Sequence, residues 1–338
     1  MRVAILAHEK FPDHAKTALG VLRYADYDVV GILDRETAGN RVSDFVPDVQ
    51  DAPIVSSMAD LEAGSVDALL IGIAPVGGGF DPSWREDVRT GLEYGCDLIS
   101  GLHYFLEDDE EFATLADEYD ADVWDVRKPH DELTVAEGVA DEVDAEVILT
   151  VGTDCSVGKM TATMELARDA REAGHDAAVV PTGQTGIMIE GWGNPVDRVV
   201  SDFTAGSVEE MILEKGDDHD YLFVEGQGSI IHPAYSAVTC GILHGAMADK
   251  LVLCHAAERE MLAYDYGVAV PSMQTYVDLY ESLAEPVHPT SVVTGALNTY
   301  GLEDDDAREA VDAFETELEK PATDVIRYGT DHLLEVLL

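Results

Sequence analysis

The chain has 338 residues, enough for two domains, and 46% of them are hydrophobic, which supplies apolar surface for two separate cores. Its 68 acidic residues outnumber 20 basic ones along the whole chain, giving a formal net charge of -48. Such a surface repels phosphate backbones and anionic membranes, so we expect neither nucleic-acid nor membrane binding. The composition is typical of cytoplasmic proteins from salt-loving archaea, in which molar salt screens the self-repulsion.

No targeting, membrane-spanning or disulfide signal stands out in the sequence. The first ten residues lead directly into an amphipathic segment, and no run of about 18 or more apolar residues follows anywhere. Cys96, Cys155, Cys240 and Cys254 are far apart and form no C-x-x-C pair, which predicts reduced thiols instead of a zinc knuckle or disulfides. We expect a cytoplasmic protein, and a homo-oligomer.

The first third of the chain alternates short β-branched runs with helical patterns, the order that builds a parallel sheet with helical crossovers. We expect a Rossmann-like domain over residues 1–127, with helices at 14–24 and 82–93. Its expected strands are 3–7, 28–33, 68–74, 97–100 and 122–126. The loop after the first strand reads AHEKFP instead of G-x-G-x-x-G, so NAD binding through the usual fingerprint is not expected.

A glycine-rich loop, PVGGGF at residues 75–80, follows a buried strand of this domain and precedes a helix. Its backbone N–H groups could meet an anion. A flexible strand-to-helix connection is an equally good interpretation.

Residues 128–145 are polar and acidic, which predicts a linker with a bridging helix over 136–143. A second α/β pattern follows, and we expect a P-loop NTPase-like domain over residues 146–338. Its expected strands are 147–151, 177–180, 221–224, 250–254 and 291–296, and its expected helices include 160–173 and 304–318.

The segment GTDCSVGKMT, residues 152–161, connects an apolar strand to a helix and is typical of a phosphate-binding P-loop. Glycines let backbone N–H groups curl around a phosphate, the helix N-terminus adds partial positive charge, and the Lys159 ammonium neutralises phosphate oxygens. An ordinary strand-to-helix turn is the alternative. The expected cofactor-binding residues are Gly152, Thr153, Asp154, Cys155, Ser156, Val157, Gly158, Lys159, Met160 and Thr161.

Five residues separate Gly152 from Gly158, one more than in the common Walker form, and the loop resembles that of the dethiobiotin-synthetase (SIMIBI-type) branch of P-loop proteins. The resemblance implies that Glu225, in VEGQG, lies near the metal and phosphates. It also implies that Asn298, in TGALN, reads an adenine ring, although a turn-forming role would explain this asparagine as well. Met160 stands where the branch has the Ser or Thr hydroxyl that holds magnesium, which leaves the metal requirement unknown.

Polar residues after the second and third strands of this domain are candidates for substrate contact. The segment PTGQTG, residues 181–186, follows the strand after which the branch carries a substrate or switch loop. The candidate substrate-binding residues are Thr182, Gln184, Thr185, Arg198, Asp202 and Gln227.

Taken together, the Rossmann-like half, GTDCSVGKMT, PTGQTG, VEGQGS with the following IIHP, and GALNTYG resemble the DgcN-type D-glutamate N-acetyltransferases, a family formerly described only as a domain of unknown function. The likeness covers essentially the whole chain. It implies acetyl transfer from acetyl-CoA to the amine of D-glutamate or a related acidic amino acid.

That chemistry needs a base for the ammonium group, donors for the thioester oxyanion and cations for two carboxylates. Glu225 and His232 are the candidates for proton transfer, although His232 could be only a loop residue. Arg127, Lys128 and Arg198 are candidates for the carboxylates, although the first two could simply pair with nearby acids. Two other functions stay possible: an ATP-dependent carboxylate ligase or kinase that requires magnesium, and a non-catalytic nucleotide-gated regulator.

Overall fold

The computed structural model describes residues 1–75, 77–264 and 266–338. The chain divides into two compact units. Unit 1 comprises residues 1–129 and 184–195, and unit 2 comprises residues 130–183 and 196–338. The division differs from the expected one because residues 130–145 belong to unit 2 and a short segment of the second half belongs to unit 1.

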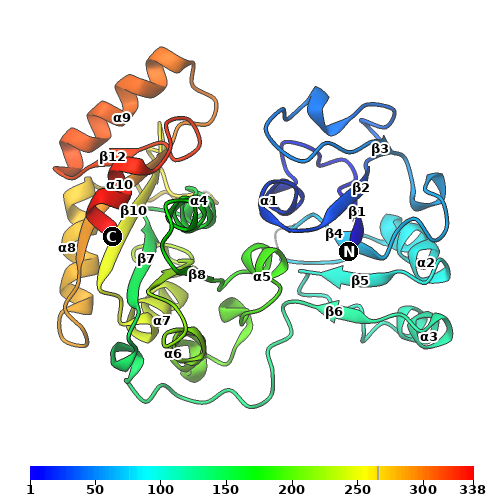
Figure 1. Cartoon of the computed structure of the whole chain (residues 1–338), viewed down its shortest axis with the longest axis horizontal. Coiled ribbons are helices and arrows are strands. Elements are labelled where there is room, and N and C mark those ends of the chain that lie inside the picture. The colour runs from blue at the N-terminus through cyan, green and yellow to red at the C-terminus, as the bar shows by residue number, and fades with distance from the viewer. Residues whose placement is uncertain (76, 265) are drawn as a thin grey trace. The chain divides into compact units, whose positions relative to one another are not determined.

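Unit 1 is built on a parallel sheet, as the alternating pattern predicts (Figure 1). Across the residues described, the strand order is β3-β2-β1-β4-β5-β6, which places β1 and β4 at the middle of the sheet. The strands are β1 (Arg2–Leu6), β2 (Asp28–Leu33), β3 (Ile54–Val55), β4 (Ala68–Ile71), β5 (Asp97–Ser100) and β6 (Val123–Asp125). The helices are α1 (Lys16–Tyr24), α2 (Arg85–Glu93), α3 (Glu110–Tyr119) and α5 (Gln184–Glu190), with 3-10 turns η1 (Val42–Asp44), η2 (Met58–Asp60) and η3 (Pro82–Trp84). The Rossmann-like prediction is confirmed.

Two helical segments of unit 1 begin at aspartate caps. The Asp81 carboxylate accepts the N–H of Ser83 in η3, which leads into α2. The Asp109 carboxylate accepts the N–H groups of Glu111 and Phe112 at the start of α3. These bonds satisfy N–H groups that have no partner inside a helix, and so they set where the two helices begin.

Helix α5 completes the core of unit 1 although it lies far along the chain. Ile187 and Met188 are buried in the same hydrophobic cluster as the strands of this sheet. The Thr185 hydroxyl is hydrogen-bonded with that of Thr17 in α1, at 2.9 Å. Residues 184–195 are therefore part of the N-terminal fold, which the sequence pattern does not reveal.

Unit 2 holds a second parallel sheet, whose described strands run in the order β12-β11-β10-β7-β9-β8. The strands are β7 (Glu146–Gly152), β8 (Ala177–Val180), β9 (Tyr221–Val224), β10 (Lys250–Ala256), β11 (Ser291–Asn298) and β12 (Ala322–Thr323). The helices are α4 (Lys159–Glu172), α6 (Thr204–Lys215), α7 (Ser236–Ala246), α8 (Met273–Ala284), α9 (Asp304–Leu318) and α10 (Asp331–Leu337), with 3-10 turns η4 (Ala140–Glu142), η5 (Val196–Arg198) and η6 (Ser201–Phe203). Strand β7 is central, and the strand-loop-helix that it forms with α4 confirms the predicted P-loop fold (Figure 1).

The expected helix over 136–143 is wrong, because only the single turn η4 forms there. The buried Glu209 carboxylate accepts the backbone N–H groups of Glu137, Gly138 and Val139, at 2.6 to 2.8 Å. Gly138 also has a φ of 75°, in the left-handed region. N–H groups that bond to a side chain cannot form the ladder of an α-helix, so the linker is extended and anchored to α6.

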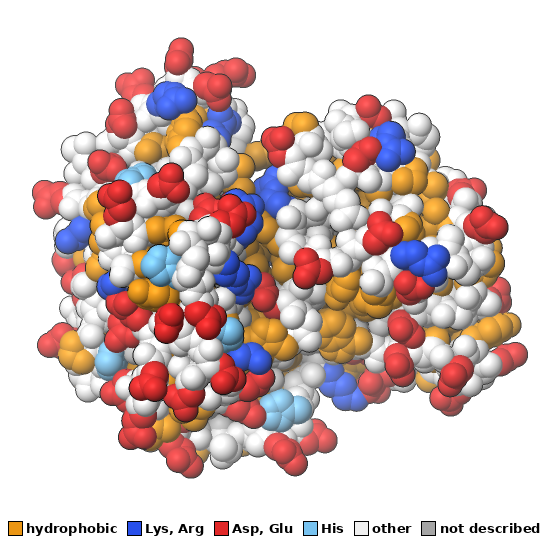
Figure 2. Space-filling model, in the orientation of Figure 1, with side chains coloured by type: hydrophobic (Ala, Val, Ile, Leu, Met, Phe, Trp, Pro, Cys, Tyr) orange, Lys and Arg blue, Asp and Glu red, His pale blue; other side chains and the backbone are white. Residues whose placement is uncertain are grey.

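Acidic side chains are scattered over the face of each unit that Figure 2 shows, and basic side chains are far fewer there. This agrees with the net charge of -48. Within the described part of the chain, no helix is both long and apolar enough to span a bilayer.

Candidate functional site

The P-loop connects the carboxyl end of β7 to the N-terminus of α4. Two of its residues have a positive φ: Ser156 at 56° and Gly158 at 103°. An ordinary side chain at Gly158 would be strained, and the turn it makes sends the chain directly into α4. The loop therefore has the backbone of an anion-binding turn at the head of a helix.

Lys159 folds back across this loop. Its side chain is buried, and its ammonium donates to the backbone oxygen of Asp154 at 2.7 Å. A Cβ at Gly152 would lie 2.8 Å from the Lys159 nitrogen, so this glycine leaves the space that the ammonium occupies. The lysine is thus positioned inside the turn where a phosphate oxygen would need a positive charge.

Hydroxyl groups behind the loop fix its carbonyl groups. The phenol of Tyr280 donates to the oxygen of Gly152 at 2.7 Å, and that of Tyr276 donates to the oxygen of Thr153 at 2.7 Å. The Ser229 hydroxyl donates to the same Thr153 oxygen at 2.9 Å. Burial raises the pKa of both phenols, which keeps them neutral donors. The loop is therefore held in place before any ligand binds.

Glu225 organises the neighbouring strand ends. Its carboxylate accepts the N–H of Thr182 at 3.2 Å and of Gly183 at 3.0 Å, and its backbone oxygen accepts the Thr182 hydroxyl at 2.6 Å. The Gln227 amide donates to the backbone oxygen of Thr182 at 2.7 Å. Three residues that the sequence predicts for the site, Thr182, Glu225 and Gln227, therefore lie together.

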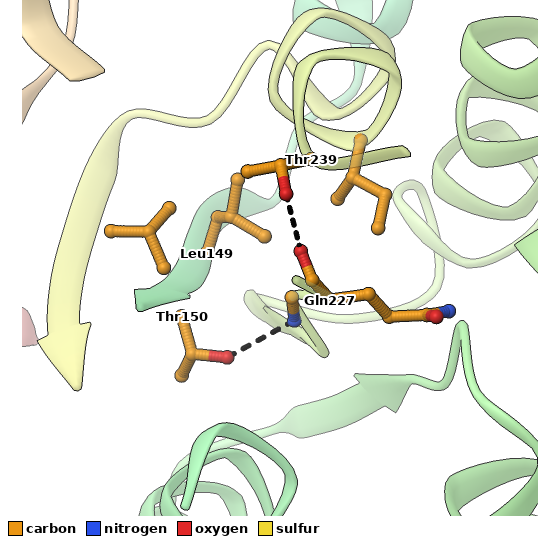
Figure 3. A pocket seen from close by; sticks show the side chains of 7 residues that line it. Leu149, Thr150, Gln227 and Thr239 are labelled. Atoms are coloured by element: carbon orange, nitrogen blue, oxygen red, sulfur yellow. Dashed lines mark hydrogen bonds between the residues drawn. The ribbon is translucent and has the colours of Figure 1, made fainter. Parts of the chain in front are cut away.

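The seam between β7 and the end of β9 is tightly closed (Figure 3). A Cβ at Gly226 would lie 1.7 Å from the oxygen of Thr150, so only glycine allows the two strands to approach this closely. The Gly226 N–H donates to the Thr150 hydroxyl at 3.1 Å, and the Thr239 hydroxyl donates to the Gln227 oxygen at 2.7 Å. Dashed lines mark these bonds in Figure 3. The remaining gap is too small for a water molecule.

A cluster of reactive groups stands beside the P-loop. The sulfur of Cys155, a carboxylate oxygen of Asp154 and a ring nitrogen of His232 lie within 4.8 Å of one another. Asp154 and His232 are fully buried, and His232 Nε2 is 3.9 Å from Asp154 Oδ1. Among the residues described, this Nε2 atom has no hydrogen-bond partner. The other carboxylate oxygen of Asp154 accepts from Arg259 at 2.8 Å, so the carboxylate is paired.

Aromatic side chains surround His232. Its ring lies 4.8 Å from that of Tyr235, 5.0 Å from that of Tyr266 and 6.2 Å from that of Tyr264. Burial, and after it the proximity of Cys155, raises the pKa of Tyr235 and of Tyr264. All three tyrosines are more than a third exposed, so they form an aromatic rim between the buried cluster and the surface.

The other side of the loop meets the ends of β10 and β11. A Cβ at Gly158 would lie 3.6 Å from the Cβ of Asn298, so the predicted adenine-reading asparagine does flank the P-loop. Its side-chain oxygen accepts the N–H of Tyr300 at 2.9 Å, which gives it a turn-forming role as well. His255, whose Nδ1 is 2.7 Å from the Thr153 hydroxyl, borders a cleft of about 590 Å³. The cleft is lined by His255, Ala257, Glu258, Leu297, Leu302, Asp306, Glu309, Ala310, Ala313, Phe314 and Glu317.

Two predicted substrate-binding residues belong to unit 1, and two more lie on surface turns of unit 2. Gln184 and Thr185 belong to unit 1, where the Gln184 side chain accepts from Arg127 at 2.7 Å. Asp202 and Arg198 are exposed on the turns η6 and η5 of unit 2. Their roles in substrate binding stay predictions.

Two further predictions concern unit 1. Buried Arg127 also donates to the oxygen of Gly101, and Lys128 pairs with Glu107, so both are engaged by unit 1 itself. The glycine loop at 75–80 includes Val76, which lies outside the described residues. Its Gly78 accepts the N–H of His103 at 2.9 Å, and anion binding by this loop stays a prediction.

Sequence reasoning missed several residues that support the P-loop. Tyr276 and Tyr280 are one helical turn apart on α8, and in the sequence only this spacing indicates that they share a helix face. Arg259 is one of 20 basic residues in a very acidic chain and follows the strand next to β7, which could have marked it. Ser229 and His255 have no distinguishing local pattern.

Comparison with known proteins places the chain in a family. Residues 134–334 match a family described as a domain of unknown function, the DUF1611 P-loop domain, and residues 35–129 match the Rossmann-like DUF1611 domain. A D-glutamate N-acetyltransferase from Tritonibacter scottomollicae is 35% identical over 83% of this chain and 84% of its own length. Another from a Pseudoalteromonas species is 32% identical over 78% of this chain and 79% of its own. The crystal structure of a DUF1611 family protein from Anabaena variabilis superposes with a TM-score of 0.94, at 37% identity, over 99% of this chain and 98% of that one. The chain therefore belongs to the DUF1611 family, together with these D-glutamate N-acetyltransferases.

Proposed function

We propose that this protein is an N-acyltransferase that moves the acetyl group of acetyl-CoA to the amine of D-glutamate. The observation that carries the proposal is the cluster that His232 forms with Asp154 and Cys155 of the P-loop. The P-loop can bind the phosphate groups of an acyl donor, and the carboxylate, thiol and imidazole beside it are groups that can take part in acyl transfer. The two curated relatives named D-glutamate N-acetyltransferase support the acceptor.

The P-loop fits the phosphate groups of coenzyme A. The buried Lys159 ammonium and the backbone N–H groups at the head of α4 supply the positive partners that phosphate oxygens need. Asn298 beside Gly158 is the candidate contact for the adenine ring next to those phosphates. The donor's flexible pantetheine arm then has to fold back so that the thioester reaches the cluster.

Magnesium has no evident hydroxyl ligand at the usual position. Met160 follows Lys159, and a thioether is a poor ligand for an ion that prefers hard oxygen atoms in octahedral geometry. Acetyl transfer needs no phosphoryl chemistry. We therefore expect the reaction to proceed with a chelator present.

Glu225 and His232 are proposed for the proton and charge handling. Glu225 accepts the proton that the substrate ammonium must lose before attack. The same carboxylate accepts the backbone N–H groups of Thr182 and Gly183, which hold it in position. His232 donates a hydrogen bond from Nε2 to the thioester oxygen as negative charge develops there. The two carboxylates of the acceptor need cations and amide donors, for which Arg198 and Gln227 are the candidates in unit 2.

The decisive experiment follows thiol release from acetyl-CoA with D-glutamate, with and without EDTA, beside ADP release from ATP with magnesium. We expect stereoselective thiol release that EDTA does not reduce. Chelator-sensitive ADP release without thiol release would contradict the proposal and favour an ATP-dependent ligase. That rival rests on the resemblance of the P-loop spacing to dethiobiotin synthetases.

A further inference from the structure

We propose that Cys155 is the acetyl carrier of this enzyme: its sulfur takes the acetyl group from acetyl-CoA and passes it to the amine. This inference rests on the proposed function and adds a covalent intermediate to it. The cysteine was expected only to line the phosphate loop. Its surroundings indicate a nucleophile.

The first argument is the placement of the sulfur. Cys155 is half-buried, whereas Cys96 and Cys254 are buried. Its sulfur lies within 4.8 Å of the buried polar atoms of His232 and Asp154. The N-terminus of α4 and Lys159 follow within the same loop, and a helix N-terminus and a nearby cation both favour a thiolate.

The second argument is an unpartnered donor aimed into the cluster. Nδ1 of His232 accepts the backbone N–H of Ala234 at 3.2 Å, so in the neutral ring the proton belongs on Nε2. That Nε2 atom is fully buried and has no hydrogen-bond partner among the described residues, although Asp154 Oδ1 is 3.9 Å away. A buried N–H without an acceptor is costly, and a thiolate or a thioester oxyanion beside it would supply one.

The same tautomer argues against a metal ion in this cluster. A histidine that binds a metal through Nε2 carries its proton on Nδ1 and donates it to an acceptor. Here Nδ1 faces a donor, the N–H of Ala234. Asp154 is already committed to Arg259 and to the N–H groups of Ala263 and Cys155. The arrangement fits thiol chemistry better than a metal centre.

The proposed steps balance without another reactant. The Cys155 thiol first loses its proton to solvent, and the thiolate attacks the thioester carbon while His232 Nε2–H holds the oxyanion. The bond from carbon to the coenzyme A sulfur breaks, and the released thiolate takes up a proton. Glu225 takes one proton from the substrate ammonium, and the neutral amine attacks acetyl-Cys155. The second proton of the amine passes to the departing Cys155 thiolate as the amide forms.

The test uses the full chain. Incubation with acetyl-CoA alone, followed by intact-mass and peptide analysis, should show one acetyl group on Cys155, and adding D-glutamate should discharge it as N-acetylglutamate. Steady-state plots should show the parallel lines of a ping-pong mechanism. Cys155→Ser and Cys155→Ala should lose thiol release by at least 100-fold, and His232→Phe should slow acetylation of Cys155 roughly 100-fold.

Cys240→Ala is the matched control, because Cys240 is also half-buried but lies in α7 and is not a member of the cluster. It should retain both the acetylation and the turnover. Full turnover by Cys155→Ala, or wild-type turnover with intersecting lines and no acetylated Cys155, would overturn the carrier and leave the acetyltransferase function standing. A metal ion that copurifies with the protein and is lost in His232→Phe would also overturn it. If no form of the protein releases thiol from acetyl-CoA, the proposed function itself fails.

Discussion

The loops after β1 and β7 occupy equivalent positions, since each follows the first, central strand of a parallel sheet. After β1, side-chain carboxylates occupy the loop: Asp34 accepts the N–H of Glu9 at 2.6 Å, and Asp87 lies 3.0 Å from the Nε2 atom of buried His8. After β7, a glycine turn leads into a helix and the only cation inside it among the described residues is Lys159. At the same topological position, unit 1 therefore has carboxylates that repel anions, and unit 2 has a cation and a helix N-terminus that attract them. Fold alone does not decide which.

Substitution of Glu225 should produce the largest effect, because this carboxylate is proposed to act in the chemical step beside the second loop. We expect Glu225→Gln to lower kcat by about 10²- to 10⁴-fold. The KM for acetyl-CoA should change only a few-fold, since the amide still presents an oxygen to Thr182 and Gly183. Steady-state kinetics measure both, with the exposed Glu172→Gln as control. A raised KM with unchanged kcat would assign Glu225 to binding.

Removing the cation of the second loop should weaken donor binding. Lys159→Ala should cost about 1.5 to 3 kcal/mol, or roughly 10- to 100-fold in affinity for acetyl-CoA, because a charge-assisted contact to phosphate is lost. Acetyl-pantetheine, which lacks the nucleotide phosphates, should bind to the wild type and the variant with equal affinity. Lys320→Ala, at an exposed position, is the control. Equal acetyl-CoA affinity in two folded proteins would remove the P-loop assignment.

The free energy of unfolding should depend on pH through His255, which is hydrogen-bonded with Thr153 of the second loop. Burial lowers the pKa of this imidazole from 6.5 to about 4. Above about pH 6.5 the His255 imidazole is neutral in both the folded and the unfolded state. As the pH falls, this imidazole takes up a proton in the unfolded state but stays neutral in the folded state. His255 should therefore cost about 2 kcal/mol of stability at pH 5. The unfolding free energy of His255→Gln relative to that of the wild type should rise by about 2 kcal/mol between pH 7.5 and pH 5. An unchanged difference would show that His255 is not held neutral.

The carboxylate of the first loop should affect stability alone. Asp34→Asn keeps one oxygen for the N–H of Glu9 but weakens the bonds from Thr37, so we expect a loss of about 1 kcal/mol. Its KM for acetyl-CoA should equal that of the wild type. Thermal unfolding measures the loss of stability, and steady-state kinetics measure the KM. A change in donor affinity would mean that the first loop also serves the ligand.

The sequence predicts the strands and the P-loop well because both depend on local pattern. The strands at 28–33 and 221–224 form with the expected bounds, since each is an apolar run bounded by polar or glycine residues. Helix α7 was missed because its sequence is apolar on most sides and carries little helical periodicity. The pairing of Cys155 with His232 joins residues 77 positions apart through tertiary packing, which no local pattern encodes.

The insertion of α5 has a consequence for synthesis on the ribosome. Unit 1 cannot bury Ile187 and Met188 until residue 195 has been made, 66 residues after its first stretch ends at residue 129. At translation rates of roughly 5 to 20 residues per second, the first stretch waits about 3 to 13 seconds with an unfinished apolar surface. During that interval β7, the P-loop and α4 emerge, so the nascent chain holds two incomplete cores at once. We therefore expect the nascent chain to need chaperones most during this interval, because the apolar surfaces of both cores are exposed.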